Sequence, residues 1–301
     1  MFRFANLYSP DHILKVEIMP ETLAAPSFPM LRAQHAPAIT LTGVDDATDP
    51  KVLQSIVREQ EDIEVEWGVL YSTSRAGSGR YPSLPKIDAL AAIEPALDAP
   101  RLSLHICGGA VRDFLAGTGH VSDVASRFWR IQLNLRAKDH DPRALLAAIE
   151  RCAERGQTVI TQHNAANASL RDTLLRLAGD AGLPNHAILF DASGGRGTLP
   201  SEWPRPVAGV ACGYAGGLGP KNLDRQLMVL TSHGVMPGEA GAWVDMESAL
   251  RDESDLFSMR LCLECIESVA RFRRVMARWA EQAVEDARER LAKQAPKSSG
   301  N

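Results

Sequence analysis

The sequence lacks the features of a membrane or secreted protein. It has no apolar run near the roughly 20 residues that a membrane-spanning helix needs. Its first 30 residues contain no signal-peptide core and are interrupted by prolines. The five cysteines are an odd number in 301 residues, which does not indicate a disulfide framework. We therefore expect a cytoplasmic protein that binds no membrane.

Neither sign of charge dominates the chain. There are 33 Lys and Arg against 37 Asp and Glu, for a net charge of −4. A field of this sign does not attract nucleic acid as a main partner. Aromatic residues make up only 6%, and no cage for a particular ring is evident. The composition therefore favours a small metabolite, which a local basic pocket could bind.

The sequence also lacks a set of residues at the spacing typical of metal ligands. Cys262 and Cys265 are spaced as Cys-x-x-Cys, but they lie in an expected helix and no second pair accompanies them. We predict that the protein uses no metal and no cofactor.

The chain divides into three parts. Residues 1–36 contain scattered prolines and no sustained period, which predicts an N-terminal extension that is poorly ordered or precedes a true start at Met30. The alternative is an ordered strand closing the floor of the fold. Residues 37–292 form one domain, and the polar tail 293–301 is expected to fray.

Eight short runs rich in apolar and β-branched residues alternate with longer turn-rich or amphipathic stretches. Such alternation predicts parallel strands, because parallel neighbours need a crossover connection. The predicted strands are 39–44, 65–71, 101–107, 128–135, 157–163, 186–191, 207–213 and 242–246. Helices are expected over 109–117, 141–155, 168–181, 220–231 and about 255–292. The proline-rich stretch 198–206 predicts little or no helix.

Eight such units could form an open doubly wound sheet or a closed barrel. No glycine fingerprint follows the first predicted strand, as it would in a doubly wound nucleotide-binding domain. The glycine-rich turns come late, where barrels place phosphate sites. We therefore predict a (β/α)8 TIM barrel with an N-terminal extension and a long C-terminal helix.

Polar residues stand at the predicted carboxyl end of every strand, where barrels hold their sites. Each also has a structural interpretation: Asp191 could cap a turn, His105 and His163 could be core histidines, and Cys107 could be a small core residue. The glycine-rich loops 191–197 and 214–222 are more specific, because their N–H groups can converge on an anion.

Several motifs resemble those of phosphoribosylanthranilate isomerase, a β/α barrel of tryptophan biosynthesis. Residues 215–222 match that family's Ala-Gly-Gly-Leu-x-Pro-x-Asn, and Asp191 precedes a matching Gly-Gly-x-Gly loop. Arg80 and Tyr81 end a loop similar to the family's Ser-x-Arg-Tyr, and Gln132 lies in a matching fourth strand. The motifs keep the family's order over about residues 39–260.

The departures from the family concern its chemistry. The resemblance implies that Asp191 is a general acid, but Thr42 stands where the family has its cysteine base. A threonine hydroxyl is too weak a base at neutral pH to replace a thiolate. Ala249 and Arg251 replace a glycine and a glutamate of the eighth-strand motif.

We predict an isomerase-like enzyme that acts on a phosphorylated sugar or phosphoribosyl compound, as a monomer or homodimer. The alternatives are a non-catalytic or regulatory barrel that binds a phosphorylated metabolite, and a true phosphoribosylanthranilate isomerase with a displaced base. The predicted catalytic residues are Asp191, His105, His163 and Thr42, with Cys107 a further possible base. The predicted substrate-binding residues are Arg80, Gln132, Asn134 and Asn164. The predicted phosphate-binding residues are Gly194, Gly195, Gly216, Gly217 and Ser248.

Overall fold

The structure is a computed structural model that describes residues 38–59, 63–93, 99–192, 194, 196–238 and 241–294. The predicted N-terminal extension over 1–36 and most of the predicted tail lie outside the described residues.

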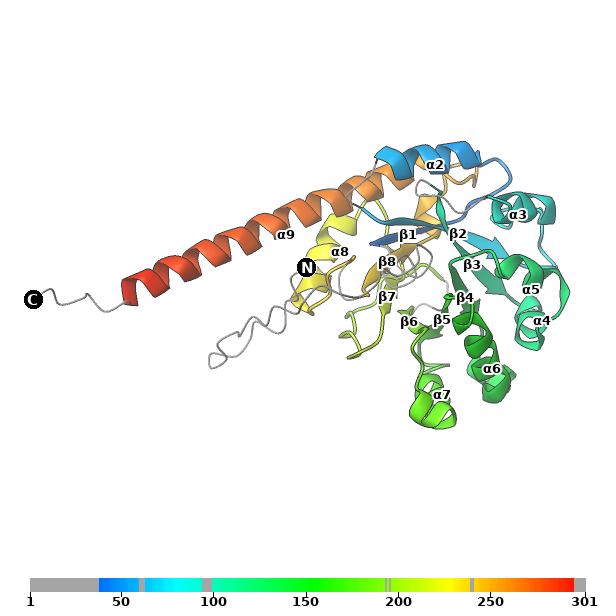
Figure 1. Ribbon diagram of the computed structural model, residues 1–301. Coiled ribbons are helices and arrows are strands. Elements are labelled where there is room, and N and C mark those ends of the chain that lie inside the picture. The colour runs from blue at the N-terminus through cyan, green and yellow to red at the C-terminus, as the bar shows by residue number, and fades with distance from the viewer. Residues whose placement is uncertain are drawn as a thin grey trace, which may run out of the picture.

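Eight parallel strands close into a barrel in chain order, with β8 paired to β1 (Figure 1). The predicted barrel is therefore confirmed. Its strands are β1 (Ile39–Thr42), β2 (Val65–Tyr71), β3 (Arg101–Cys107), β4 (Arg130–Asn134), β5 (Thr158–His163), β6 (His186–Phe190), β7 (Cys212–Ala215) and β8 (Trp243–Met246).

Helices surround the strands (Figure 1). They are α2 (Pro50–Glu59), α3 (Leu84–Ala91), α4 (Ala110–Ala116), α5 (Gly119–Ala125), α6 (Pro142–Ala153), α7 (Leu170–Ala178), α8 (Leu223–Ser232) and α9 (Met259–Gln294), with short 3₁₀ turns at η1 (Ala137–Asp139), η2 (Gly179–Ala181) and η3 (Ser248–Leu250). No helix was predicted from the sequence over α2, α3 or α5. The prediction that 198–206 form no helix is confirmed.

The start of α6 shows how local chemistry sets these bounds. The side chain of Asp141 accepts a hydrogen bond of 2.9 Å from the backbone N–H of Arg143, and Pro142 occupies the first turn. A carboxylate cap satisfies an otherwise unpaired N–H, and proline fixes the helical φ without losing a needed donor.

Strand seven begins later than predicted. The apolar run 207–210 suggested a strand, but it forms a turn in which Val210 N–H donates to the carbonyl of Val207. Gly209 has φ +72°, which an extended strand does not adopt. The shift carries Tyr214 into the strand, and its ring packs outside the barrel between Phe190 and Trp203. Tyr214 therefore does not line the inside of the barrel.

Alternate residues of each strand face the inside of the barrel. Many of these residues are polar. Two glycines make room there for larger neighbours. A Cβ on Gly68 would lie 2.2 Å from Thr42 Oγ1, and one on Gly213 would lie 2.3 Å from the Trp243 ring. At the amino end of the strands, Glu66 and Arg130 form a buried ion pair.

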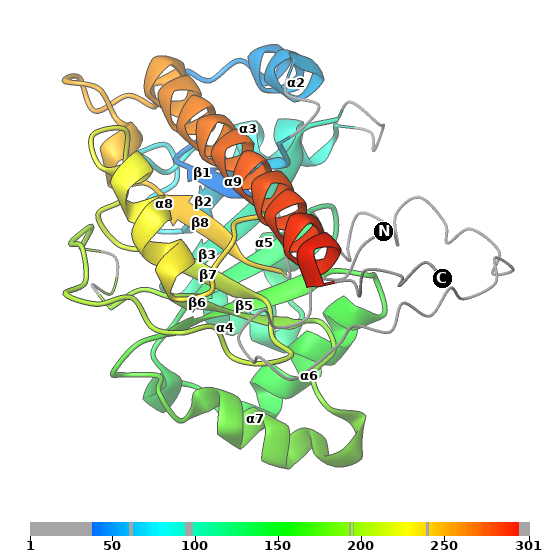
Figure 2. The same cartoon turned by 90° about the vertical axis from the view of Figure 1, so that its left-hand side faces the viewer.

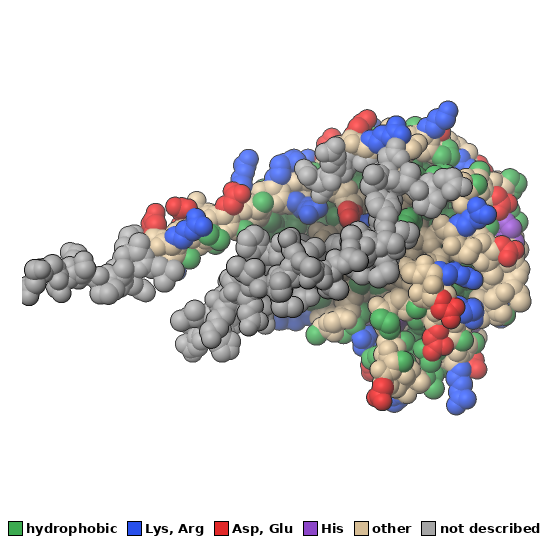
Figure 3. Space-filling view, in the orientation of Figure 1, with side chains coloured by type: hydrophobic (Ala, Val, Ile, Leu, Met, Phe, Trp, Pro, Cys, Tyr) green, Lys and Arg blue, Asp and Glu red, His purple; other side chains and the backbone are tan. Residues whose placement is uncertain are grey.

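The long helix α9 was predicted to begin near residue 255, but it starts at Met259 after a turn. In its first half the side chains of Cys262, Ile266 and Val269 are buried, and this half lies beside α8 (Figure 2). Its second half extends away from the barrel and bears side chains of both charges (Figure 3). No helix among the described residues has the length and apolar character needed to cross a membrane.

Candidate active site

A cavity of about 340 Å³ opens at the carboxyl ends of the strands. Side chains from β1, β3, β4, β5, β6 and β8 line it, together with the loops that follow β6, β7 and β8. We call it the mouth cavity. Its polar and glycine residues are Thr42, His105, Gln132, Asn134, Gln162, Asp191, Gly197, Gly216, Gly217, Asp245, Glu247 and Ser248.

Asp245 is the most unusual group in the mouth cavity. Its carboxyl group is only 4% exposed and accepts a hydrogen bond of 3.0 Å from Thr42 Oγ1. Burial raises the pKa of Asp245 well above its ordinary value, and the nearby carboxylates of Glu247 and Glu66 act in the same direction. Asp245 forms no ion pair within the described part of the chain. Its carboxyl group is therefore held in the protonated form over a wider pH range than usual.

Asp245 is one of the polar residues at the predicted strand ends, but the sequence predicted no role for it. The available signal was the two-residue period of β8, which points Trp243 and Asp245 to the same inner side. Thr42 was predicted because of its position in the cysteine motif. In the structure it is the hydrogen-bond donor to Asp245, seated over Gly68.

Asp191 ends β6 at the same cavity and is 4% exposed. The loops after β6 and β7 meet beside it, as the sequence predicts. A Cβ on Gly216, where φ is +117°, would lie 2.8 Å from the carbonyl oxygen of Thr198 and 3.7 Å from Asp191 Oδ1. A Cβ on Gly217 would lie 2.6 Å from the backbone nitrogen of Leu199. Only glycine allows the two loops to approach this closely.

The β6 loop places its glycines differently from the prediction. Gly197 lines the mouth cavity, and a Cβ there would lie 3.4 Å from Ser248 Oγ. Gly194 lines a neighbouring cleft instead, and Gly195 lies outside the described residues. Ser248, Gly216 and Gly217 do line the mouth cavity.

The two predicted histidines have different positions. His105 lines the cavity, its Nε2 lies 3.0 Å from Ser103 Oγ, and burial and the charge of Arg130 lower its pKa to about 3. It is therefore a neutral hydrogen-bonding group at neutral pH. His163 faces the other side of β5, where its ring meets Phe190 edge-on at 5.3 Å. His163 is therefore not part of this cavity, contrary to the prediction.

Three amide side chains form a belt across the cavity. Gln132 Nε2 and Gln162 Nε2 donate to Asn134 Oδ1 at 3.1 Å and 3.3 Å, and Asn134 Nδ2 donates to Cys107 Sγ at 3.1 Å. The Oε1 atom of Gln132 is buried and has no partner among the described residues. Burial raises the pKa of Cys107, so its thiol is a poor source of thiolate.

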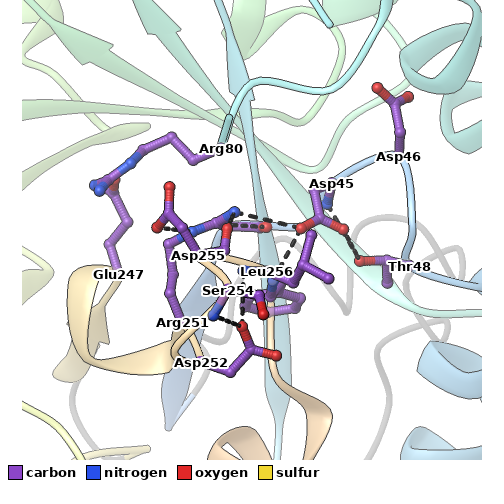
Figure 4. A network of polar contacts seen from close by, with 12 residues as sticks. Asp45, Asp46, Thr48, Arg80, Glu247, Arg251, Asp252, Ser254, Asp255 and Leu256 are labelled. Atoms are coloured by element: carbon purple, nitrogen blue, oxygen red, sulfur yellow. Dashed lines mark hydrogen bonds and ion pairs between the residues drawn. The ribbon is translucent and has the colours of Figure 1, made fainter. Parts of the chain in front are cut away.

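Arg80 lies at the rim, on the loop after β2. Its guanidinium donates to Glu247 Oε1 at 2.5 Å (Figure 4). It also donates to Ser248 Oγ at 3.5 Å. The predicted carboxylate-binding arginine is therefore paired with a carboxylate of the protein itself. It would have to leave Glu247, or share it, to bind a substrate anion.

Arg251 anchors the connection between β8 and α9 to the start of the barrel (Figure 4). Its side chain is 3% exposed and lies 3.4 Å from Asp45 Oδ2 and 2.7 Å from Asp255 Oδ1. Asp45 also accepts a hydrogen bond from the backbone N–H of Phe257 at 2.9 Å. The arginine that replaces the family's glutamate therefore has a structural role in closing the barrel mouth between β8 and β1.

Asn164 was predicted to bind substrate but does not line the mouth cavity. It lines the neighbouring cleft, where its side-chain oxygen accepts a hydrogen bond of 3.0 Å from Ala166 N–H. In the part of the chain that the structure describes, no group of three or more His, Cys, Asp or Glu side chains could hold a metal ion.

A closed ring of eight parallel strands with a polar cavity at their carboxyl ends defines a (β/α)8 TIM barrel. Among solved structures, the fold is similar to phosphoribosyl anthranilate isomerase from Thermus thermophilus, with 16% identity, a TM-score of 0.51, and coverage of 78% of this chain and 98% of that chain. It is also similar to TrpF from Jonesia denitrificans, with 16% identity, a TM-score of 0.50, and coverage of 77% and 96%.

At this level of identity the likeness shows the fold. No protein-family model matches the chain, and no curated protein matches it in sequence.

Proposed function

We propose that the protein is an isomerase that acts by proton transfer on a phosphorylated sugar or phosphoribosyl compound bound in the mouth cavity. The observation that carries this proposal is the presence of two buried carboxyl groups, Asp191 and Asp245, on one cavity beside two glycine-lined loops. The fold neighbour titled phosphoribosyl anthranilate isomerase supports the same reaction class.

Asp245 replaces the missing cysteine as the second member of the acid–base pair. Two carboxyl groups whose environments differ can divide the roles of acid and base between them. The raised pKa of Asp245 makes it the group that begins the cycle protonated, so it donates a proton to the ring oxygen of the substrate as the ring opens. Asp191 accepts the proton that leaves carbon 2 of the sugar, and the electron pair of that C–H bond forms the C1–C2 double bond of an enol or enamine.

This division reverses the role that the resemblance implies for Asp191. It also gives Thr42 a function, because its hydroxyl fixes the orientation of the Asp245 carboxyl group. His105 stays neutral and can only orient hydroxyl groups of the substrate.

The glycine loops would hold the phosphate. No hydrogen bond from the backbone N–H of Gly217 or Leu218 is found among the described residues, and Ser248 Oγ lies beside Gly197 in the adjoining loop after β6. Unpaired N–H groups at a cavity wall are suitable donors to an anion.

A second candidate is a barrel that binds such a compound without converting it. The observation that favours it is the threonine at the position of the expected base, because loss of a base costs about 10²- to 10⁴-fold in rate.

Turnover and thermal shift, measured together, separate the two. Phosphoribosylanthranilate and ribose 5-phosphate are tested first, with the wild type, Asp191→Asn, Asp245→Asn and the exposed control Asp123→Asn. We expect turnover by the wild type and the control, and a loss of about 10²- to 10⁴-fold in each cavity variant.

Stabilisation by ligand without turnover would favour the binding protein. No stabilisation by any phosphorylated compound would contradict both candidates. If Asp245→Asn keeps the turnover of the wild type, Asp245 is not a member of the acid–base pair.

A further inference from the structure

A second, larger cavity opens beside the mouth cavity. It has a volume of about 740 Å³ and shares the lining residues Asn134 and Gln162 with the mouth cavity, so the two cavities are adjacent. Its other lining residues follow β3, β4, β5 and β6, whereas the glycine loops that border the mouth cavity follow β6 and β7. We call this second cavity the basic cleft.

Positive charge gathers in the basic cleft. Arg112 on α4, Arg136 after β4 and Arg196 after β6 all line it, and Asp139 is the carboxylate among its lining residues. Neither Arg112 nor Arg136 forms an ion pair with another described residue, which distinguishes them from Arg80 at the rim. Burial and the charge of Arg112 lower the pKa of His140 in the same cleft.

We propose that the basic cleft binds a second anionic group at the far end of the substrate. The substrate is then a bis-anionic compound, with one phosphate at the glycine loops and a second phosphate or a carboxylate against Arg112 and Arg136. This inference rests on the proposed function, because it assigns the other end of the same substrate. Guanidinium groups suit this task, since they bind phosphate and carboxylate through paired hydrogen bonds.

The amide belt between the two anion sites fits the uncharged middle of such a compound. Gln132 Oε1 is a buried acceptor without a partner among the described residues, and buried polar groups are normally paired. A hydroxyl group of the substrate would supply the missing donor.

Calorimetric titration at fixed ionic strength tests the proposal. The probes are ribose 5-phosphate with one phosphate, ribulose 1,5-bisphosphate with two, and 6-phosphogluconate with a phosphate and a carboxylate. The proteins are the wild type, Arg112→Gln/Arg136→Gln, and the control Arg127→Gln/Arg155→Gln. The control removes the same charge from a cavity at the amino ends of the strands.

The wild type and the control should bind ribulose 1,5-bisphosphate at least about tenfold more tightly than ribose 5-phosphate. In Arg112→Gln/Arg136→Gln this advantage should fall to about twofold or less, with the affinity for ribose 5-phosphate unchanged. Equally tight binding of 6-phosphogluconate would assign a carboxylate as well as a phosphate to the cleft. Weaker binding of 6-phosphogluconate would assign a phosphate alone.

The proposal is overturned if the wild type binds the bisphosphate no more tightly than the monophosphate, or if the advantage survives the double substitution. Failure to bind ribose 5-phosphate, the bisphosphate or phosphoribosylanthranilate would instead contradict the proposed function.

Discussion

The floor and the mouth of the barrel are both polar, but they differ in how charge is compensated. At the floor, Glu66 accepts hydrogen bonds of 3.0 Å from Thr40 and from Arg130, and the Arg130 guanidinium lies 4.0 Å above the Trp243 ring. At the mouth, Asp245 has a threonine hydroxyl as its partner and no cation among the described residues.

This difference separates an ion-paired site from the proposed functional site within the same ring of strands. The charge of the buried Glu66 carboxylate is compensated by the Arg130 guanidinium, although Glu66 Oε2 and Arg130 Nη2 have no hydrogen-bond partner among the described residues. Burial without a paired cation raises the pKa of a carboxyl group, so Asp245 keeps its proton to a higher pH than an ordinary aspartate. The floor therefore contains an ion pair within the protein, and the mouth contains the carboxyl group on which the proposed chemistry depends.

The largest expected effect comes from breaking the ion pair at the floor. Glu66→Gln leaves Arg130 buried without its counter-ion and should lower the free energy of unfolding by about 3–5 kcal/mol, as measured by urea denaturation. The double variant Glu66→Gln/Arg130→Met removes both charges and should recover most of this loss. A single variant as stable as the wild type would show that the pair contributes nothing.

The pH dependence of stability should separate two mouth groups with opposite effects. The pKa of His105 is lowered from 6.5 to about 3, so the folded state binds its proton less well than the unfolded chain. Its contribution to stability is therefore complete above pH 6.5 and is lost as pH falls, by up to about 1.4 kcal/mol per pH unit.

The raised pKa of Asp245 acts in the other direction. The folded state holds this proton more tightly, so the free energy of unfolding falls as pH rises from 3.8 through the raised pKa. Relative to the wild type, Asp245→Asn should therefore gain stability as pH rises over this window, and His105→Gln should gain stability as pH falls. Urea denaturation at several pH values measures both, and parallel profiles for all three proteins would contradict the assignment.

Two threonines provide a smaller and closely matched test. Thr40→Val removes a hydrogen bond to the ion-paired Glu66 and should cost about 1.5–3 kcal/mol, the range for charged partners. Thr42→Val removes a hydrogen bond to the protonated Asp245 and should cost only about 0.5–1.5 kcal/mol. Equal losses in chemical denaturation would mean that the two carboxyl groups carry similar charge.

The smallest effect is expected at the rim. Arg80 and Glu247 are about one-third exposed, at 33% and 31%, so their ion pair should contribute roughly 0.2–1 kcal/mol. Arg80→Gln should therefore barely change the unfolding midpoint. A loss above about 2 kcal/mol would show that the pair anchors the loop after β2 more firmly than an exposed ion pair does.

The sequence predicts the barrel because its signals are local. Short β-branched runs, the Asp141–Pro142 helix start and the late glycine turns each specify one element without help from distant residues. It misplaced strand seven because an apolar turn and an apolar strand have similar composition. Whether His163 faces the inside or the outside of the barrel depends on strand register. The sequence does not reveal the register of a residue at the end of a strand.

The role of Asp245 could not be derived from sequence for a different reason. Its properties depend on Thr42, which is 203 positions away along the chain, and on the packing that excludes water from both. Arg112 and Arg136 likewise come together only because the loops after β3 and β4 are neighbours in the closed ring.

Carboxyl carbon-13 NMR across a pH titration measures the central difference between mouth and floor most directly. The wild type should contain one aspartate whose midpoint lies well above 3.8, and that resonance should vanish in Asp245→Asn. If every aspartate of the wild type titrates near the ordinary value, the mouth holds no retained proton and the proposed acid–base pair is wrong.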